Sequence, residues 1–191
     1  DALWPDEDGD AAMEAFRVAI HRLRKMLGEA DVLEITDGLV SLNLTRCWLD
    51  AIAFENAVRT TGLPENGEEA TDTDRVLRLY RGHFLPGEEE APWALSRRER
   101  LRAKFIGYVA RMGKRLEHAG CYDLAADYYC RGIEADDLAE EFYQGLMRCH
   151  IQAGRNSEGM SVYRRLRQTL SVTLGIAPST SSERLFQSMQ Q

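Results

Sequence analysis

An internal period of 34 residues in the second half of the chain limits most strongly what this sequence can fold into. Pairs of small residues, large apolar residues and single small residues recur at this offset: Ala119-Gly120 and Ala153-Gly154, Tyr108 and Phe142, Met112 and Leu146, Ala125 and Gly159, and Tyr129 and Tyr163. Between the glycine and aspartate residues that break this pattern, apolar residues follow the spacing of amphipathic helices. The period therefore predicts a unit of two helices joined by a short turn, used twice.

A repeated helix pair needs small residues where its helices approach and a large aromatic residue in the gap to the next pair. A helix–turn–helix period of 34 residues is that of tetratricopeptide arrays. We expect two such repeats, at roughly 105–138 and 139–172. Helices at 73–82 and 180–189 would cover the open ends, since stacked repeats need caps. The alternative is a chance similarity between amphipathic helices.

Glycine and aspartate breakers place the other helices of this half. We expect helices at about 93–118, 122–134, 138–152 and 156–173. Residues 63–73 hold no apolar run, which predicts a linker or long loop, and residues 82–92 form a second loop with the acidic run Glu88-Glu89-Glu90.

The N-terminal part has a different pattern. A helix is expected from Asp10, its N-cap, to Gly28 just after its end, with a core face of Phe16, Ile20, Leu23 and Leu27. Asp37-Gly38 stands between two short β-type runs, 32–35 and 39–42, which is a strong hairpin signal. Another helix opens at Leu49 and ends near Gly62. The predicted fold class is mostly α: a helix with a β-hairpin wing, the second half of a winged helix, followed by a helical repeat array.

The first helix is basic although the chain carries a net charge of −7. Arg17, His21 and Arg24 follow i, i+4, i+7 spacing and form one stripe, which is able to enter a major groove while the hairpin touches flanking phosphates. The alternative is a solvated amphipathic helix. A second basic run, from Arg97 to Lys104, is either another DNA contact, a surface for an acidic partner or, more simply, a solvated face.

Other classes of protein fit poorly. A pI near 5.2 argues against coating nucleic acid by bulk charge. No apolar run is long enough to span a membrane, and no signal peptide is visible. The spacing of Cys47, Cys121, Cys130 and Cys149 matches no zinc template, so we expect no metal and four reduced, mostly buried thiols in a cytoplasmic protein. No catalytic motif or cofactor loop is present, which predicts a protein that is not an enzyme and holds no cofactor.

Several segments resemble known regulators. AIHRLRKMLG (19–28) resembles the recognition helix of OmpR-type winged helices, and LEITDGLVSLN (33–43) resembles the wing of that domain. WLDAIAFE, LYRGHFLPGEEEAPWALSRRERLR, EEFYQGLM and LGIAPSTSSERLF resemble the bacterial transcriptional activator domain of the AfsR/SARP family and of MalT-like regulators. The resemblance covers essentially the whole chain and looks closest to the MalT-like group.

The resemblance implies a transcriptional activator with two domains. Residues 1–48 would be the C-terminal part of a winged-helix DNA-binding domain, and residues 49–191 the bacterial transcriptional activator domain with tetratricopeptide-like helix pairs. The DNA-binding residues carried over by position are Arg17, His21, Arg22, Arg24 and Lys25. The inner face of the repeats would bind a partner through Lys114, Glu117, His118, Gln144, Arg148 and Gln152.

The implied partners are double-stranded promoter DNA and, through the repeats, RNA polymerase, a sensor or ATPase module of the same chain, or a second copy. The family's winged helix starts with a small sheet and two helices, of which only Ala2-Leu3-Trp4 has a counterpart here, so we expect a fragment of a longer regulator. A tetratricopeptide-type protein-interaction module without DNA binding is the alternative function. A small-ligand sensor inside the repeat is a third.

Overall fold

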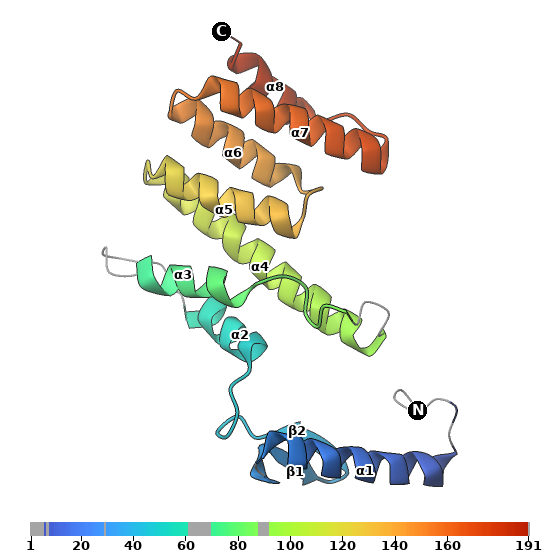
Figure 1. Cartoon of the computed structure of the whole chain (residues 1–191). Helices are drawn as coiled ribbons and strands as arrows, with labels where there is room; N and C mark the ends of the chain where they lie inside the picture. Colours follow the sequence, from blue (N-terminus) through green and yellow to red (C-terminus); the bar gives the residue numbers. More distant parts are fainter. Residues whose placement is uncertain (1–5, 7, 29, 61–69, 88–91, 191) are drawn as a thin grey trace. The chain divides into compact units, whose positions relative to one another are not determined.

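The computed structural model describes residues 6, 8–28, 30–60, 70–87 and 92–190, in two compact units (Figure 1). The first unit comprises residues 1–81 and 90–95, and the second comprises 82–89 and 96–191. The first unit contains α1 (Gly9–Leu27), a short 3₁₀ turn (Ala30–Val32), strands β1 (Leu33–Thr36) and β2 (Leu39–Leu42), and helices α2 (Asp50–Thr60) and α3 (Ala70–Leu79). The mostly α fold class predicted from the sequence is confirmed.

Helix α1 begins two residues earlier than predicted. The N-cap is Asp8, whose carboxylate accepts a hydrogen bond from the Ala11 amide at 2.9 Å, so the prediction of Asp10 is wrong. Asp8 and Asp10 are equally good capping residues by type, and with Asp8 as the cap the charge of Asp10 lies in the first turn, where the helix dipole favours it. Gly28 ends the helix in the left-handed conformation at φ 76°, as expected.

The hairpin forms in the predicted register. β1 pairs antiparallel with β2, with Leu33 opposite Leu42 and Ile35 opposite Val40. Asp37 and Gly38 both have positive φ, 52° and 77°, which is the type I′ turn that matches the right-handed twist of the strands.

The core face predicted for α1 is only partly covered. No residue of α1 is buried: Phe16 and Ile20 are partly exposed, and Leu23 and Leu27 are 45% and 46% exposed. The hydrophobic periodicity predicts correctly which side of the helix is apolar. It does not predict how much apolar surface the described residues supply to cover that side.

Helices α2 and α3 pack on each other around Phe54 and Val76, which are 2% and 0% exposed. The Phe54 and Tyr80 rings lie 5.5 Å apart between centroids. Residues 70–73 were predicted as loop, and this is wrong because α3 begins at Ala70. Its first turn, Ala-Thr-Asp-Thr, carries no apolar signal. Of the predicted loops, residues 61–69 and the run Glu88–Glu90 lie outside the described residues, as does Ala2–Trp4.

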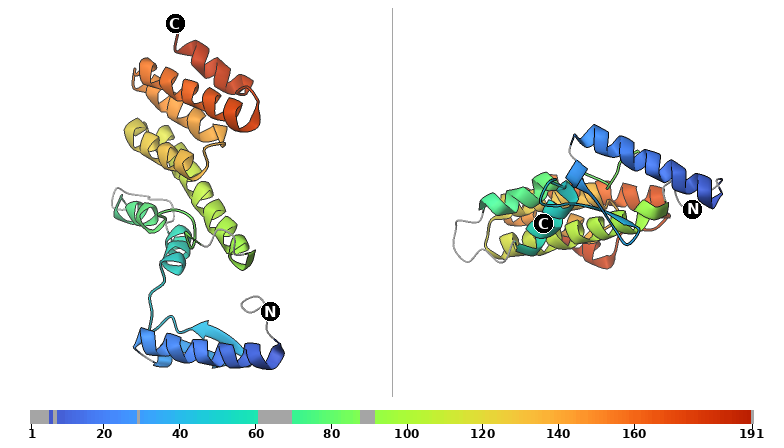
Figure 2. Two further views of the ribbon diagram at one scale, coloured as in Figure 1. Left: turned by 45° about the vertical axis from the view of Figure 1, so that its right-hand side comes forward. Right: turned by 90° about the horizontal axis from the view of Figure 1, so that it is seen from below.

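The second unit is a stack of helices (Figures 1 and 2). It contains α4 (Pro92–His118) from Ser96 onward, α5 (Tyr122–Ala135), α6 (Glu140–Gln152), α7 (Asn156–Leu174) and α8 (Thr180–Ser188). The bounds of all five helices are within two residues of those predicted. α6 packs against α5, α7 and α8. Ser182 and Met189 are buried at the C-terminal end, and Phe186 stacks on Tyr163 at 4.3 Å, so α8 covers this end as predicted. α3 belongs to the first unit, and a capping role for it stays a prediction.

The predicted 34-residue repeat is visible in the turns between helices. Gly120 and Gly154 have φ of 75° and 70°, and each donates to the carbonyl three residues earlier. The following residues, Cys121 and Arg155, each donate to the carbonyl five residues earlier, at 2.9 and 2.8 Å. These bonds form the same glycine-ended helix terminus at both positions.

Tyr129 is the aromatic residue that fills the gap between repeats. A Cβ at Gly113 of α4 or at Gly145 of α6 would meet the Tyr129 ring at 2.6 Å or less, so both helices present bare backbone to it. Tyr129 and Tyr163, its counterpart one repeat later, are 1% and 8% exposed. Close approach at glycine and filling by an aromatic ring are the steric basis of the period.

Candidate DNA and partner interfaces

The first candidate site is the basic side of α1. Four of its five predicted DNA-binding residues are exposed: Arg17, His21, Arg22 and Lys25. The Arg17 guanidinium lies 3.7 Å from the Glu14 carboxylate, but the two side chains are 72% and 69% exposed. An ion pair this exposed is worth little, so Arg17 remains available to another anion.

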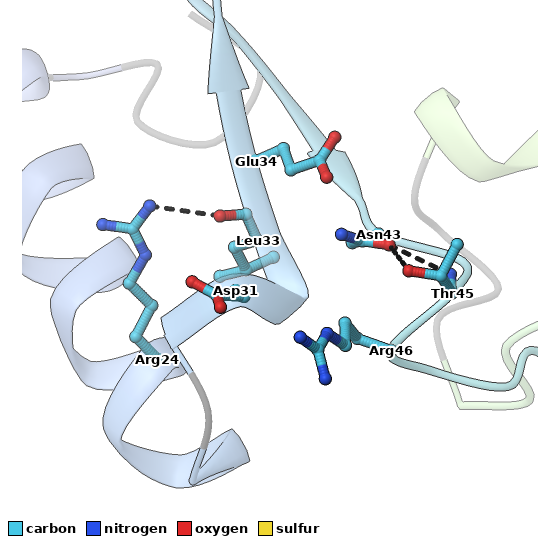
Figure 3. A pocket seen from close by; sticks show the side chains of 7 residues that line it. All are labelled: Arg24, Asp31, Leu33, Glu34, Asn43, Thr45 and Arg46. Carbon is cyan, nitrogen blue, oxygen red and sulfur yellow. Dashed lines mark hydrogen bonds between the residues drawn. The ribbon is translucent and has the colours of Figure 1, made fainter.

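Arg24, the fifth residue, faces the hairpin. Its Nη2 donates to the Leu33 carbonyl at 3.1 Å, and its buried Nε has no partner among the described residues. Figure 3 shows the guanidinium reaching from α1 toward the start of β1. Arg24 therefore fixes the hairpin to the helix, and its predicted contact with DNA stays a prediction.

A polar pocket lies beside Arg24, at the start of β1 and the loop after β2 (Figure 3). Its lining residues are Arg24, Asp31, Leu33, Glu34, Asn43, Thr45 and Arg46. The Asn43 side chain accepts from the Thr45 amide at 3.0 Å and from its hydroxyl at 2.6 Å, which holds the loop after β2. Arg46 is an exposed cation on this loop that the sequence analysis missed. Its position just after the hairpin was the available signal.

The second candidate site is the inner face predicted for the repeats. The structure brings Glu117 of α4 and Arg148 of α6 together in a two-pronged ion pair, with Arg148 Nη2 donating to Glu117 Oε2 at 3.0 Å. The Tyr129 hydroxyl donates to the same oxygen at 2.7 Å. Burial alone would raise the pKa of Glu117, but the hydrogen bonds from Arg148 and Tyr129 hold it below its usual value. The charged Glu117 carboxylate therefore links the two repeats through its bonds to Tyr129 and Arg148.

Gln144 also has an internal partner. Its amide donates to the hydroxyls of Ser179 and Ser182 at 3.2 and 3.0 Å. The Glu140 carboxylate accepts from both of these hydroxyls and from the Ser179 amide, at 2.6 to 3.1 Å. This cluster attaches the N-terminus of α8 to α6.

The other predicted inner-face residues are more exposed. Lys114 approaches the Glu141 carboxylate at 3.9 Å across the surface, and His118 bonds through Nδ1 with the Lys114 carbonyl at 2.7 Å. Gln152 is exposed. Three of the six predicted partner-binding residues, Lys114, His118 and Gln152, therefore remain on an open surface.

Neither a metal centre nor a thiol site emerges from the described residues. They contain no group of three or more His, Cys, Asp or Glu side chains that could hold a metal ion. All four cysteines are free, but only Cys149 is buried, whereas Cys121 and Cys130 are exposed, so the expectation of mostly buried thiols is wrong. Burial raises the pKa of Cys149 to about 11.

Within the described residues, no helix is both long and apolar enough to cross a membrane.

Two curated regulatory proteins are similar to this chain over nearly its whole length. The regulatory protein AfsR of Streptomyces griseus is 27% identical over 183 residues, which cover 93% of this chain and 18% of AfsR. AfsR of Streptomyces coelicolor is 29% identical over 196 residues, which cover 100% of this chain and 20% of AfsR. The chain thus spans about a fifth of the length of these curated relatives.

Mycobacterium tuberculosis EmbR, solved in complex with a low-affinity phosphopeptide, matches 99% of this chain and 52% of the EmbR chain with a TM-score of 0.61. At 19% identity, this likeness shows the fold alone.

The profile of the family described as "Bacterial transcriptional activator domain" matches residues 49–190. This is a family of transcriptional regulators and not a class of enzymes. Because the match covers most of the sequence, this chain belongs to the bacterial transcriptional activator domain family.

Proposed function

We propose that this chain is the part of a cytoplasmic transcriptional activator that binds promoter DNA through α1 and the hairpin and contacts protein partners through the helical repeats. Residues 1–48 are the C-terminal part of the winged-helix domain, and residues 49–191 form the partner-binding domain, without catalytic activity. The start of the family match at residue 49 supports this boundary. The protein partner is one of three kinds: RNA polymerase, a sensor or ATPase module of the same protein, or a second copy of this chain.

The observation that carries the DNA-binding proposal is the charge of α1. Arg17, His21, Arg22 and Lys25 are exposed together on one helix of a chain with a net charge of −7. A helix of this width fits the major groove, and cations on it contact phosphates and base edges. Arg24 positions the hairpin beside that helix. The exposed side of the hairpin would then reach the DNA backbone that flanks the groove.

Titration of labelled duplex DNA, followed by fluorescence anisotropy, tests this proposal. With roughly three phosphate contacts, affinity should fall about 40-fold between about 50 and 200 mM salt, because each neutralised phosphate releases counterions. A salt-independent affinity, or no binding at the lower salt, would contradict it. The latter result would favour a protein-interaction module without DNA binding.

A further inference from the structure

A cluster of titratable and charged side chains joins the two repeats at the turn between α6 and α7: Asp123, His150, Arg155 and Glu158. Asp123 lies in the first turn of α5, and His150 lies in the last turn of α6. Arg155 is the N-cap residue of α7, and Glu158 lies in its first turn. In the corresponding turn of the first repeat, Cys121 takes the place of Arg155. The cluster therefore belongs to the second turn alone, and the proposed function does not use it.

Arg155 connects the members of this cluster. Its Nη2 donates to the Asp123 carboxylate at 2.6 Å, and its Nε donates to Nδ1 of His150 at 3.4 Å. Its backbone amide also donates to the His150 carbonyl at 2.8 Å. Because a guanidinium can only donate, Nδ1 accepts with its lone pair, and His150 is the neutral imidazole with its proton on Nε2. Neutral His150 thus holds Arg155 where its guanidinium reaches the first repeat.

Protonation of His150 is incompatible with this bond. An imidazolium carries a hydrogen on both nitrogens, so Nδ1 can no longer accept from Arg155, and two cationic groups then face each other. The Glu158 carboxylate lies 3.9 Å from Nδ1 and 3.6 Å from the Arg155 Nε. After protonation, His150 and Arg155 would therefore compete for Glu158, and Arg155 would keep only its exposed bond to Asp123.

The position of His150 is set by close packing. Its side chain is 16% exposed, and a Cβ on Gly159 of α7 would lie 3.4 Å from the His150 Cβ, so the side chain leaves α6 against bare backbone of α7. Burial and the positive charge of Arg155 lower the pKa of His150, whereas Glu158 and Asp123 act in the opposite direction. Burial and Arg155 prevail, so the folded chain favours neutral His150.

We propose that His150 and Arg155 form a pH-sensitive link between the two repeats, which is closed while His150 is neutral and weakens when His150 takes up a proton. Because α6 packs against both α5 and α7, weakening this link loosens the repeat stack. The unfolded chain takes up the proton at the ordinary imidazole pKa of about 6.5, and the folded chain does so only at lower pH. Stability is therefore full above about pH 6.5 and falls as the pH decreases from there. This link is independent of DNA binding by α1.

An NMR titration of the histidine side chains in the intact chain tests the link directly, with the His150 signal assigned from the His150→Gln variant. The midpoint for His150 should lie below about 6.5. Arg155→Ala should raise this midpoint, because it removes the cation that faces Nδ1. The matched control is Arg164→Ala, which removes an exposed cation elsewhere on α7 and should leave the midpoint unchanged. A wild-type midpoint at or above the ordinary value, or no response to Arg155→Ala, would overturn the proposal.

Thermal melting at about pH 7.5 and about pH 5.5 measures the consequence for stability. The melting temperature of the wild-type chain should be at least about 3 °C lower at the acidic pH. His150→Gln should remove most of this difference, because the glutamine amide oxygen accepts a hydrogen bond but does not titrate. His118→Gln replaces an exposed histidine of α4 and should keep the difference. Equal pH dependence in the wild type and the His150→Gln variant would contradict the link.

Discussion

Replacing Gly145 with alanine is expected to destabilise the helical repeat by about 3 kcal/mol, the upper end of the cost of overpacking a core. A Cβ on Gly145 would meet three atoms of the Tyr129 ring, and the ring has no room to retreat because Gly113 stands against it as closely. Tyr129 is also fixed by its hydrogen bond to Glu117 at 2.7 Å. The melting temperature should fall by about 10 to 20 °C for a unit of this size, measured by circular dichroism.

Gly107 provides the matched control for this substitution. It lies in α4, is exposed, and has no atom within 4 Å of a Cβ built on it. Gly107→Ala should therefore raise stability by about 0.5 to 1 kcal/mol, since alanine loses less backbone entropy in a helix. Equal shifts in melting temperature for the two variants would mean that Tyr129 does not fill the gap between repeats as described.

Removing three charges from α1 is expected to have the largest functional effect. In the variant with Arg17→Ala, Arg22→Ala and Lys25→Ala, affinity for duplex DNA at about 50 mM salt should fall at least about 30-fold, and the dependence on salt should become nearly flat. These side chains are exposed and the described residues give them few internal partners, so the fold should be unaffected. Fluorescence anisotropy measures both quantities.

The control is the variant with Arg164→Ala, Arg165→Ala and Arg167→Ala in α7, because it removes the same number of positive charges from exposed side chains. It should retain DNA affinity within about twofold, because the proposed phosphate contacts are made by α1 and the hairpin. If both variants lose affinity equally, DNA responds to overall charge and α1 is not the DNA-reading helix.

The sequence predicts most of the helices and turns because their signals are local. Gly28, Gly120 and Gly154 end helices in the left-handed conformation, and Asp37-Gly38 forms the hairpin turn as its residue types require. The start of α3 could not be located, since helix first turns are polar and look like loops. Capping by Asp8 instead of Asp10 is a choice between two equivalent signals.

The partners of the candidate site residues were harder to predict because they depend on residues far apart in the chain. Glu117 and Arg148 are 31 residues apart, and Gln144 and Ser182 are 38 apart, so no local periodicity shows that these side chains pair with each other. The helix face of each was predictable, but its partner was not. For Arg24 the spacing indicates a stripe with Arg17, yet the nearby Leu33 carbonyl attracts its guanidinium.

Hydrogen–deuterium exchange of the chain, measured with and without duplex DNA, shows which segments the DNA covers and therefore tests DNA binding by α1 and the hairpin. With DNA bound, exchange should slow in α1 and in the hairpin, residues 9–42, and should not change in α5–α7, residues 122–174. Protection confined to the repeats, or no protection under conditions where anisotropy reports bound DNA, would contradict DNA binding by α1 and the hairpin.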